Sequence, residues 1–390
     1  MSSLINRLNK NLSILKPNSI LEFNAEISQI EDIVHLTIGE PDFNTPNHVK
    51  QAAIKSIENN ESHYTNPRGT TELRTAASQF LKLKYDLDYK PEDQLIITAG
   101  VTEAIYATLS TILNPGDKVI LPTPIFPLYI PIMEFLGASP LYIDTSKTDF
   151  KLSKDQLQEA LDENGESVKA VVLNFPNNPT GVTYTQAELE DLATVISKND
   201  IFCISDEIYS ELSYQHDHVS MGTILPEQTL VFNGVSKSHA MTGWRIGVIG
   251  GPALIINEIN KVHQFLITSA TTNAQAAATE AFKNGLEDGP QMREAYAKRV
   301  AILEAGLSQL GFDYVKPNGA FYLFAKIPEQ FTQDSFEFSR QLAYSAKVAV
   351  IPGYCFGPGG EGYVRISFAA SEKNIKTALD RIKSFLNQVK

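Results

Sequence analysis

Cysteine is scarce in this chain, which has two among its 390 residues, Cys203 and Cys355. Two isolated cysteines cannot form a disulfide framework, and they do not show the paired CxxC spacing of a zinc site. Cys203 lies in the apolar run Ile201–Ile204, where a free cysteine is usually a core residue. The seven histidines show no metal-ligand spacing either, so we expect no metal centre.

Long apolar runs are also absent. Residues 1–18 alternate polar and apolar side chains and lack the hydrophobic core of a secretory signal. Elsewhere no run approaches the roughly 20 apolar residues that span a bilayer. We therefore expect a cytoplasmic protein with no membrane segment.

Positive charge is in the minority, with 33 Lys and Arg against 45 Asp and Glu and a net charge of −12. That balance argues against broad binding to nucleic acid or to a membrane surface. A small anionic ligand stays compatible with it, because a few local cations can dominate one pocket.

The chain does contain a regular alternation of short β-rich runs and helical stretches. Several runs are almost continuously apolar, as expected of strands buried on both faces of a sheet. Strands alternating with helices predict an α/β fold, a three-layer α/β/α large domain with a mostly parallel sheet, which we place at residues 45–287. The predicted strands are Gln94–Thr98, Lys118–Leu121, Pro140–Ile143, Ala170–Asn174, Ile201–Ser205, Leu230–Asn233 and Ile246–Gly250.

The helical segments include Thr70–Tyr85, Thr102–Leu113 and Thr185–Lys198, which have apolar residues at helical spacing. The C-terminal part differs, because a long helical pattern is followed by isolated strands and helices. It predicts a smaller α+β domain at residues 288–390, with residues 1–44 packing against it. Its predicted elements are helices at Gln291–Leu310, at Phe336–Ala346 and at the C-terminus, and strands near Ala320–Phe324 and Tyr363–Phe368.

Unusual motifs follow five of the predicted strands. In a parallel α/β sheet, ligands bind outside the carboxyl ends of the strands. We therefore expect these motifs to share one pocket. They are Gly100–Glu103, Pro124–Phe126, Asn177–Gly181, Asp206–Tyr209 and Ser236–His239.

Lys237 is the first candidate within these motifs. It follows a buried strand, lies between Ser236 and Ser238, and precedes Arg245 by eight residues. Desolvation or a neighbouring cation lowers the pKa of a lysine amine, and the neutral amine can form a Schiff base. A single lysine is more often a solvated surface charge. That interpretation becomes less favoured when the other motifs are considered together with Lys237.

Asp206 and Tyr209 form the second candidate pair. Asp206 ends an apolar strand, where an unpaired carboxylate is costly. A protonated pyridine nitrogen is a suitable partner, and a structural cap on the following helix is the alternative. Tyr209 is expected to share a helical face with Asp206. Its hydroxyl could then bind a phenolic oxygen on the same ring, unless it is a packed core tyrosine.

Weaker signals come from two loops. Asn178 lies in the tight turn Asn177–Gly181, and its amide can donate to a phenolate oxygen. Thr102 begins a helix after Gly100, where backbone N–H groups and a hydroxyl can bind phosphate. Turns and helix N-termini are common, so neither signal is specific when taken alone.

Three more residues have a functional and a structural interpretation. Phe126 could supply an aromatic face for a planar ring, although core packing is the commoner role. Arg365 is the one charge in the strand-like run Gly362–Ser367, and its planar fork suits a carboxylate; a structural ion pair is the alternative. Gly39 lies where backbone could approach a ligand closely.

The histidines carry no evident catalytic role. His239 adjoins Lys237 and is expected to support its loop. His216 and His218 lie in a polar stretch and are expected to be exposed.

Together these residues resemble the class I and II pyridoxal-phosphate aminotransferases of fold type I. The string Ser236–Gly247 (SKSHAMTGWRIG) is highly specific, and so are the order and spacing of Asn178, Asp206, Tyr209, Lys237, Arg245 and Arg365. The resemblance runs from about Leu36 to the C-terminus. It implies an enzyme that uses pyridoxal 5′-phosphate to move an amino group from an amino acid to a 2-oxo acid by a ping-pong mechanism.

The resemblance also implies roles for individual residues. Lys237 would hold the cofactor as a Schiff base and move the substrate proton, and Asp206 would pair with the pyridine nitrogen. Arg365, the backbone of Gly39 and Asn178 would bind the substrate. The other cofactor contacts would come from Asn178 and Tyr209 at the phenolic oxygen, Phe126 on the ring, and Val101, Thr102, Ser236 and Arg245 at the phosphate.

Two positions set conditions on this assignment. Tyr64 would reach the phosphate of the neighbouring subunit's cofactor, which requires a homodimer with shared active sites. Many relatives have a phosphate-binding serine three residues before the lysine, whereas this chain has Gly234. Ser236 or the backbone must then compensate.

The choice of substrate stays open. The whole chain is most similar to the aromatic amino acid aminotransferases of lactic-acid-type bacteria, but N-acetyl-diaminopimelate aminotransferases of lysine biosynthesis share nearly every motif. A pyridoxal-phosphate-dependent C–S β-lyase is a rival within the same fold. A cofactor-sensing regulator would need a DNA-binding segment, and the roughly 35 residues before the first family motif are too few for one.

Overall fold

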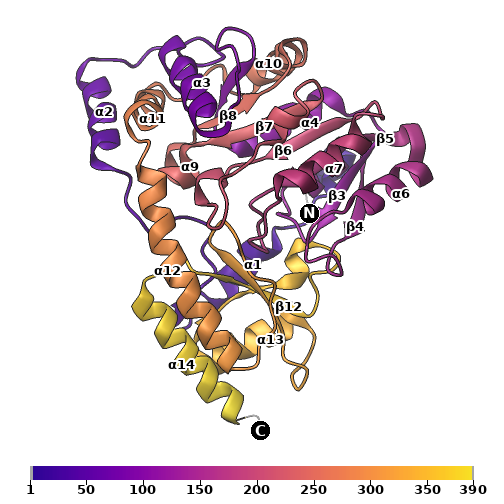
Figure 1. The fold of residues 1–390 in the computed structure, drawn as a ribbon, viewed down its shortest axis with the longest axis vertical. Coiled ribbons are helices and arrows are strands. Elements are labelled where there is room, and N and C mark those ends of the chain that lie inside the picture. Colours follow the sequence, from indigo (N-terminus) through magenta and orange to yellow (C-terminus); the bar gives the residue numbers. More distant parts are fainter. Residues whose placement is uncertain (1–2, 389–390) are drawn as a thin grey trace.

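The computed structural model describes residues 3–388. The chain forms a large α/β part and a smaller part built mostly from its C-terminal residues (Figure 1). The long helix α12 (Asp288–Gln309) leads from one part to the other. Among the described residues, no helix is both long enough and apolar enough to cross a membrane.

The large part is organised by a seven-stranded sheet in the order β2-β8-β7-β6-β5-β3-β4. All seven predicted strands are confirmed, and the sheet is parallel except for β8, which runs antiparallel to both of its neighbours. The strands are β2 (Leu95–Thr98), β3 (Lys118–Thr123), β4 (Ser139–Asp144), β5 (Val168–Asn174), β6 (Phe202–Asp206), β7 (Thr229–Gly234) and β8 (Gly247–Gly250).

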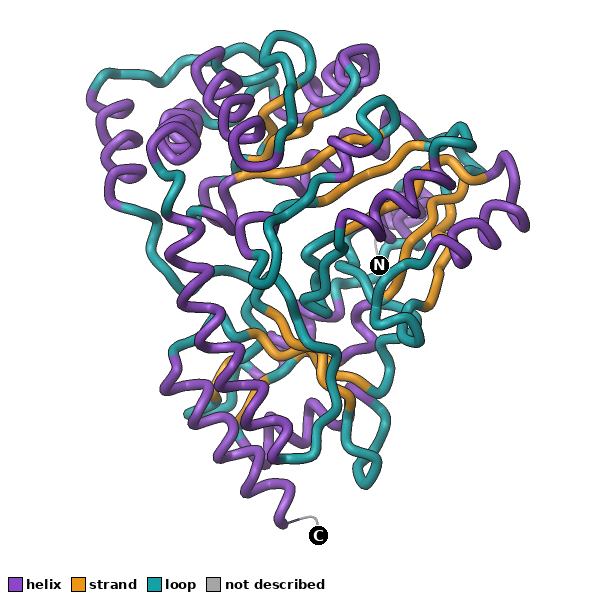
Figure 2. The backbone as a smooth tube through the Cα atoms, in the orientation of Figure 1, coloured by secondary structure: helices purple, strands orange, loops and turns teal. Residues whose placement is uncertain are grey.

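Helices cover both faces of this sheet, so the predicted three-layer arrangement is confirmed (Figure 2). On β7, Leu230 and Phe232 pack on one helical layer while Val231 packs on the other, as side chains that alternate along a strand must. The first layer contains α4 (Val101–Ile112), α5 (Tyr129–Phe135) and α10 (Ala253–Ile267). The second contains α2 (Asn47–Glu58), α3 (Thr71–Tyr85), α6 (Lys154–Asn164), α7 (Gln186–Ile196) and α11 (Thr272–Asn284).

The smaller part combines helices with a three-stranded antiparallel sheet in the order β11-β12-β9. Its strands are β9 (Tyr322–Lys326), β11 (Ile351–Pro352) and β12 (Tyr363–Ser367), and its helices are α12, α13 (Ser335–Gln341) with a π-helical turn at Leu342–Ala346, and α14 (Glu372–Gln388). Most of the expected elements are therefore present, within a few residues of their predicted positions.

The N-terminal segment packs against this smaller part. Strand β1 (Val34–His35) pairs in parallel with β10 (Val348–Ala349). Phe23 and Ile27 of α1 (Ser19–Ile27) share a core cluster with Phe324. The exact boundaries, 44/45 and 287/288, stay a prediction.

The segment after Asp206 is not the expected helix. Asp206 Oδ1 accepts a hydrogen bond from the Ile208 N–H at 3.2 Å, which produces a turn, and only a short 3-10 helix follows at Ser210–Leu212. The prediction that Asp206 and Tyr209 share a helical face is therefore wrong. An aspartate at a strand end competes with the backbone for its N–H groups and favours a turn.

His218 also differs from expectation, because its side chain is 1% exposed. Its Nε2 lies 2.9 Å from the Glu207 carboxylate, and its ring stacks on Phe175. Glu207 is fully buried and therefore needs hydrogen-bond partners. His218 is one of them. His216 is exposed, as expected.

Close backbone packing positions the start of α4. Strands β7 and β8 pair Gly234 with Gly247 beside the first residue of that helix. A Cβ on Gly247 would lie 2.7 Å from the Gly100 carbonyl carbon and from the Val101 nitrogen. Glycine is therefore required at position 247 for the sheet and helix to meet in this way.

We predict that Gly247→Ala lowers the free energy of unfolding by about 1–3 kcal/mol, the usual cost of inserting a methyl group into a filled space. Urea denaturation measures the change. Gly243→Ala is the matched control, because a Cβ there meets nothing within 4 Å. Equal stability of the two variants would contradict the packing argument.

Candidate active site

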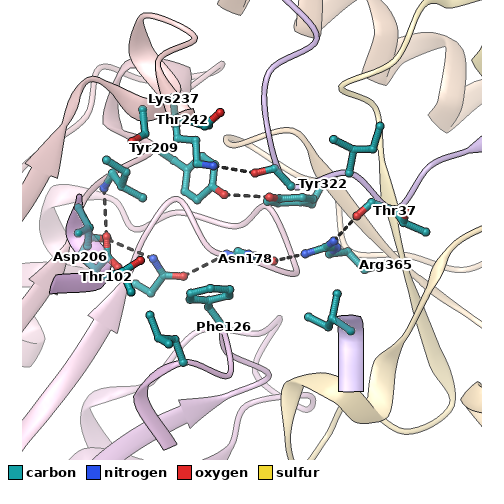
Figure 3. A pocket seen from close by; sticks show the side chains of 18 of the residues that line it. Thr37, Thr102, Phe126, Asn178, Asp206, Tyr209, Lys237, Thr242, Tyr322 and Arg365 are labelled. Atoms are coloured by element: carbon teal, nitrogen blue, oxygen red, sulfur yellow. Dashed lines mark hydrogen bonds between the residues drawn. The ribbon is translucent and has the colours of Figure 1, made fainter. Parts of the chain in front are cut away.

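A cavity of about 550 Å³ lies at the carboxyl edge of the large sheet and is closed on the other side by the smaller part and the N-terminal segment (Figure 3). Every predicted site residue except Tyr64 lines it. The tertiary structure thus brings together Gly39, Val101, Thr102, Phe126, Asn178, Asp206, Tyr209, Ser236, Lys237, Arg245 and Arg365. Tyr64 lies outside the cavity and is 86% exposed.

Asp206 is a buried carboxylate that faces the cavity from the end of β6. Its Oδ2 accepts a hydrogen bond from the Tyr129 hydroxyl, and its Oδ1 accepts from the Ile208 N–H. Burial raises the pKa of Asp206 to about 6, although the hydrogen bonds oppose the shift. A cation in the cavity would therefore be a favourable partner for its ionised form.

Lys237 lies on the short helix α9 (Val235–Ser238), which directly follows β7. Its Nζ donates to the Gly39 carbonyl at 2.6 Å and lies 5.7 Å from the centre of the Tyr209 ring. Burial lowers the pKa of the Lys237 amine to about 8, and the nearby cations Arg245 and Arg365 act in the same direction. A larger fraction of this amine is thus neutral near pH 8 than for an ordinary lysine.

Arg365 lies in β12 on the opposite side of the cavity (Figure 3). Its Nη1 donates to Asn178 Oδ1 at 2.9 Å, and its Nη2 donates to the Thr37 carbonyl at 2.7 Å. The guanidinium stacks 4.4 Å from the centre of the Tyr322 ring. Burial lowers the pKa of Arg365 from its usual value, yet all its hydrogen-bonding partners are neutral. This fork is therefore held in place without a countercharge.

Tyr209 and Tyr322 connect the two sides of the cavity. Their hydroxyl oxygens are 2.9 Å apart, and both side chains are buried. Burial raises the pKa of Tyr209 well above its usual value, so the hydroxyl keeps its proton. Tyr209 therefore reaches the cavity as predicted, although it does so from a turn.

The N-terminus of α4 forms a third corner of the cavity. Gly100 precedes it with a positive φ of 78°, and a Cβ there would fall 2.7 Å from the Arg245 guanidinium carbon. Arg245 Nη2 lies 3.4 Å from the Thr102 hydroxyl. Free backbone N–H groups, a hydroxyl and a guanidinium thus converge, which is a donor set suited to phosphate.

The sequence profile described as "Aminotransferase class I and II" matches residues 31–382. The chain belongs to this family. The chain has the fold type I architecture of the solved aminotransferase structures that it resembles. An aspartate aminotransferase from Thermus thermophilus, solved with maleate, superimposes with a TM-score of 0.92 at 36% identity, covering 97% of this chain and 99% of that one.

Two relatives differ in the activity that their names give. A probable N-acetyl-LL-diaminopimelate aminotransferase of Bacillus subtilis is 46% identical over 379 residues, or 97% of this chain and 95% of that protein. The aromatic-amino-acid aminotransferase 2 of Thermococcus litoralis is 34% identical over 389 residues, or 98% of this chain and 99% of that protein. Similarity to these relatives therefore shows that the protein is an aminotransferase. It does not identify the amino donor, because the two relatives differ in theirs.

Class I and II aminotransferases use pyridoxal 5′-phosphate, and the residues of the cavity fit this cofactor. Asp206 offers a buried carboxylate to the ring nitrogen, Lys237 an amine of lowered pKa to the carbonyl carbon, and the start of α4 a set of donors to the phosphate. Arg365 Nε is buried and has no hydrogen-bond partner. This atom is available to a further anion, as an α-carboxylate would be.

Three contacts in this aminotransferase site were missed from the sequence. Tyr129, which donates to Asp206, follows Phe126 by three residues in the same post-strand segment, so its position was a usable signal. Asn174 ends a predicted strand, and its side chain binds the backbones of Asp206 and Asn178. No feature of the sequence indicated Tyr322. It belongs to β9 of the smaller part, and its hydroxyl reaches the cavity only because that part packs on the large one.

The glycine that replaces the phosphate-binding serine of many relatives has a structural reason. A Cβ on Gly234 would lie 2.8 Å from the Ile246 carbonyl oxygen, across the β7–β8 pair. A serine does not fit this backbone arrangement. Ser236, which lines the cavity and is mostly buried, is left as the nearby hydroxyl on the same helix.

We predict that the rate at which the cofactor-free protein binds pyridoxal 5′-phosphate covalently rises with pH, with a midpoint near pH 8. The amine must be neutral to attack, and the lowered pKa of Lys237 places this change near 8 rather than near the usual value for lysine. Stopped-flow absorbance between pH 6 and 9.5 measures the rate. N-acetyl-lysine in the same buffers corrects for titration of the cofactor itself, and Lys237→Ala should show no covalent capture. A midpoint near pH 10 would contradict the prediction.

Proposed function

We propose that this aminotransferase moves the amino group of an aromatic L-amino acid to a 2-oxo acid such as 2-oxoglutarate. The observation that carries the choice of donor is the apolar lining of the cavity. Among the described residues, the cations that line the cavity are Lys237, Arg245 and Arg365, and each has a proposed role with the cofactor or the α-carboxylate.

The side-chain end of the substrate would meet mainly apolar groups. Ile20 and Leu21 of α1 and Ile38 line the cavity together with Ile105 and Leu128. An apolar wall favours an apolar side chain over a second carboxylate, because an unpaired charge is costly to desolvate. Phenylalanine, tyrosine and tryptophan meet this condition, and their rings fill more of such a wall than an aliphatic side chain does.

Arg365 would fix the orientation of the substrate. Its fork is buried, already hydrogen-bonded to Asn178 and Thr37, and stacked on Tyr322, so little side-chain entropy is lost on binding. A carboxylate at this fork would replace water by charge-assisted hydrogen bonds. The α-carbon of the substrate then lies on the Lys237 side of the cavity.

Lys237 would act as the base and the acid. Bound pyridoxal phosphate supplies an electron sink, which makes the hydrogen on the substrate α-carbon acidic. The Lys237 amine, once released from the cofactor, would accept that proton and return it at a neighbouring carbon. Asp206 would keep the ring nitrogen protonated, and Tyr209 and Asn178 would donate to the phenolic oxygen. Phe126 would pack against the ring.

A second candidate donor is N-acetyl-LL-diaminopimelate, because the Bacillus subtilis relative with that name is 46% identical to this chain. Asn24 and His35 line the same cavity and are polar. They could hydrogen-bond to the acetamide or the distal carboxylate of this longer substrate. Reaction without an acceptor, as in a C–S β-lyase, has no support from the relatives described above, which are all aminotransferases by name.

We predict that phenylalanine, added without an acceptor, converts the bound cofactor to its amino form, and that 2-oxoglutarate reverses the change. Absorbance of the bound cofactor follows both steps. Aspartate and N-acetyl-LL-diaminopimelate are tested in parallel as the acidic and long-chain donors. A faster reaction with N-acetyl-LL-diaminopimelate would replace the aromatic assignment by the second candidate, and a faster reaction with aspartate would contradict the argument from the apolar wall.

Steady-state kinetics test the reaction type separately. Donor and acceptor would use the same cavity in turn, so double-reciprocal plots at several acceptor concentrations should give parallel lines. Lys237→Ala should lower kcat by about 10²- to 10⁴-fold, because the proton acceptor and donor is lost. Intersecting lines, or substantial turnover by Lys237→Ala in the absence of added amine, would contradict the mechanism.

A further inference from the structure

A buried pair of titratable residues lies behind the start of α4 and outside the lining of the cavity. His263 of α10 is fully buried. Its Nδ1 lies 2.6 Å from Glu103 Oε1, and its Nε2 lies 2.6 Å from the Pro67 carbonyl oxygen. None of the cofactor and substrate roles proposed above uses this pair.

Both nitrogens of the His263 ring face acceptor oxygens. The Pro67 carbonyl can only accept a hydrogen bond, so Nε2 is placed to donate to it. Nδ1 faces a carboxylate oxygen of Glu103. An imidazolium at this position would donate to both oxygens and would cancel the negative charge of Glu103.

Glu103 connects this pair to the proposed phosphate site. It lies in the first turn of α4, and its Oε2 accepts the Ala99 N–H at 2.6 Å. A glutamate that reaches back in this way holds the junction between β2 and the helix. Val101 and Thr102 lie between Ala99 and Glu103 in the chain, and their N–H groups would bind the phosphate.

The third segment in the cluster is the loop that contains Pro67. This loop also carries Tyr64, the residue expected to reach a neighbouring subunit. His263 therefore holds the start of α4 and the Tyr64 loop to the same helix, α10. Loss of the ring would release both contacts and leave Glu103 without its buried partner.

We propose that His263 and Glu103 are positioning residues for the cofactor phosphate, with His263 cancelling the charge that Glu103 would otherwise place behind the phosphate site. A phosphate monoester carries nearly two negative charges at neutral pH. An unpaired carboxylate in the first turn of the same helix would repel it. The junction itself needs only a side-chain oxygen that accepts the Ala99 N–H, which a glutamine can also supply. The proposal does not depend on which amino acid is the donor.

The test compares two ligands of the full-length, cofactor-free protein. In His263→Gln, the Kd for pyridoxal 5′-phosphate should rise about tenfold, the size of effect expected from one added charge at a partly screened distance. The Kd for pyridoxal, which has no phosphate, should stay within about twofold. Absorbance titration measures both constants, and circular dichroism checks the fold.

The second variant removes the charge itself. Adding Glu103→Gln to His263→Gln should bring the Kd for pyridoxal 5′-phosphate back to within about threefold of the original protein, because the repelling carboxylate is gone. Glu258→Gln is the matched control on α10, since that carboxylate is exposed and paired with Lys261. It should leave both constants unchanged.

Each other outcome overturns the proposal. Equal weakening of both ligands by His263→Gln would show a general structural role, and no weakening would show no role. Failure of the double variant to recover affinity would show that charge is not the cause. If His263→Gln does not fold, the same comparison of the two ligands is made with His263→Asn: selective weakening of pyridoxal 5′-phosphate supports the proposal, and equal weakening of both ligands overturns it.

Discussion

Burial of ionisable side chains at the carboxyl edge of the sheet is the constraint on which the rest of the site depends. Removal from water raises the pKa of Asp206 to about 6 and lowers that of Lys237 to about 8, and it lowers that of Arg365 as well. Each group is thereby held in a state that a ligand of complementary charge can stabilise. With the proposed roles, a protonated ring nitrogen would be the partner of Asp206 and an α-carboxylate that of Arg365, while the neutral amine of Lys237 could attack a carbonyl carbon.

The backbone around this cavity leaves little freedom for side chains. Gly234 and Gly247 lie opposite each other where β7 and β8 meet, and the start of α4 packs directly against Gly247. This packing brings the donors of α4 to the end of the strand that leads to Lys237. The distance between the proposed phosphate site and the lysine is therefore defined by regular secondary structure rather than by a loop. The buried pair of Glu103 and His263 supports the same junction from behind.

The substrate side of the cavity has a different origin. Arg365 comes from β12 of the smaller part, and it binds the carbonyl of Thr37 in the N-terminal segment and the side chain of Asn178 in the large part. Tyr322 meets Tyr209 across the same boundary. Both parts of the chain must be in place for the carboxylate-binding fork to form. With the proposed roles, recognition of the substrate would be coupled to the packing of the smaller part on the larger one, while the proposed cofactor contacts belong mainly to the large sheet.

The sequence by itself determined the seven strands, the three-layer arrangement and the residues that gather at the carboxyl edge, because apolar runs and post-strand positions are local properties of the chain. It also indicated the family, through the Ser236–Gly247 string. Only the tertiary structure decided which groups meet. The contact between Tyr129 and Asp206 joins segments far apart in the chain. The turn after Asp206 and the pairing of His218 with Glu207 are local, but the apolar and polar pattern alone did not indicate which acceptor each group would find. Arg365 and Thr37 are separated by 328 residues, and no local pattern encodes which distant carbonyl a buried guanidinium will find.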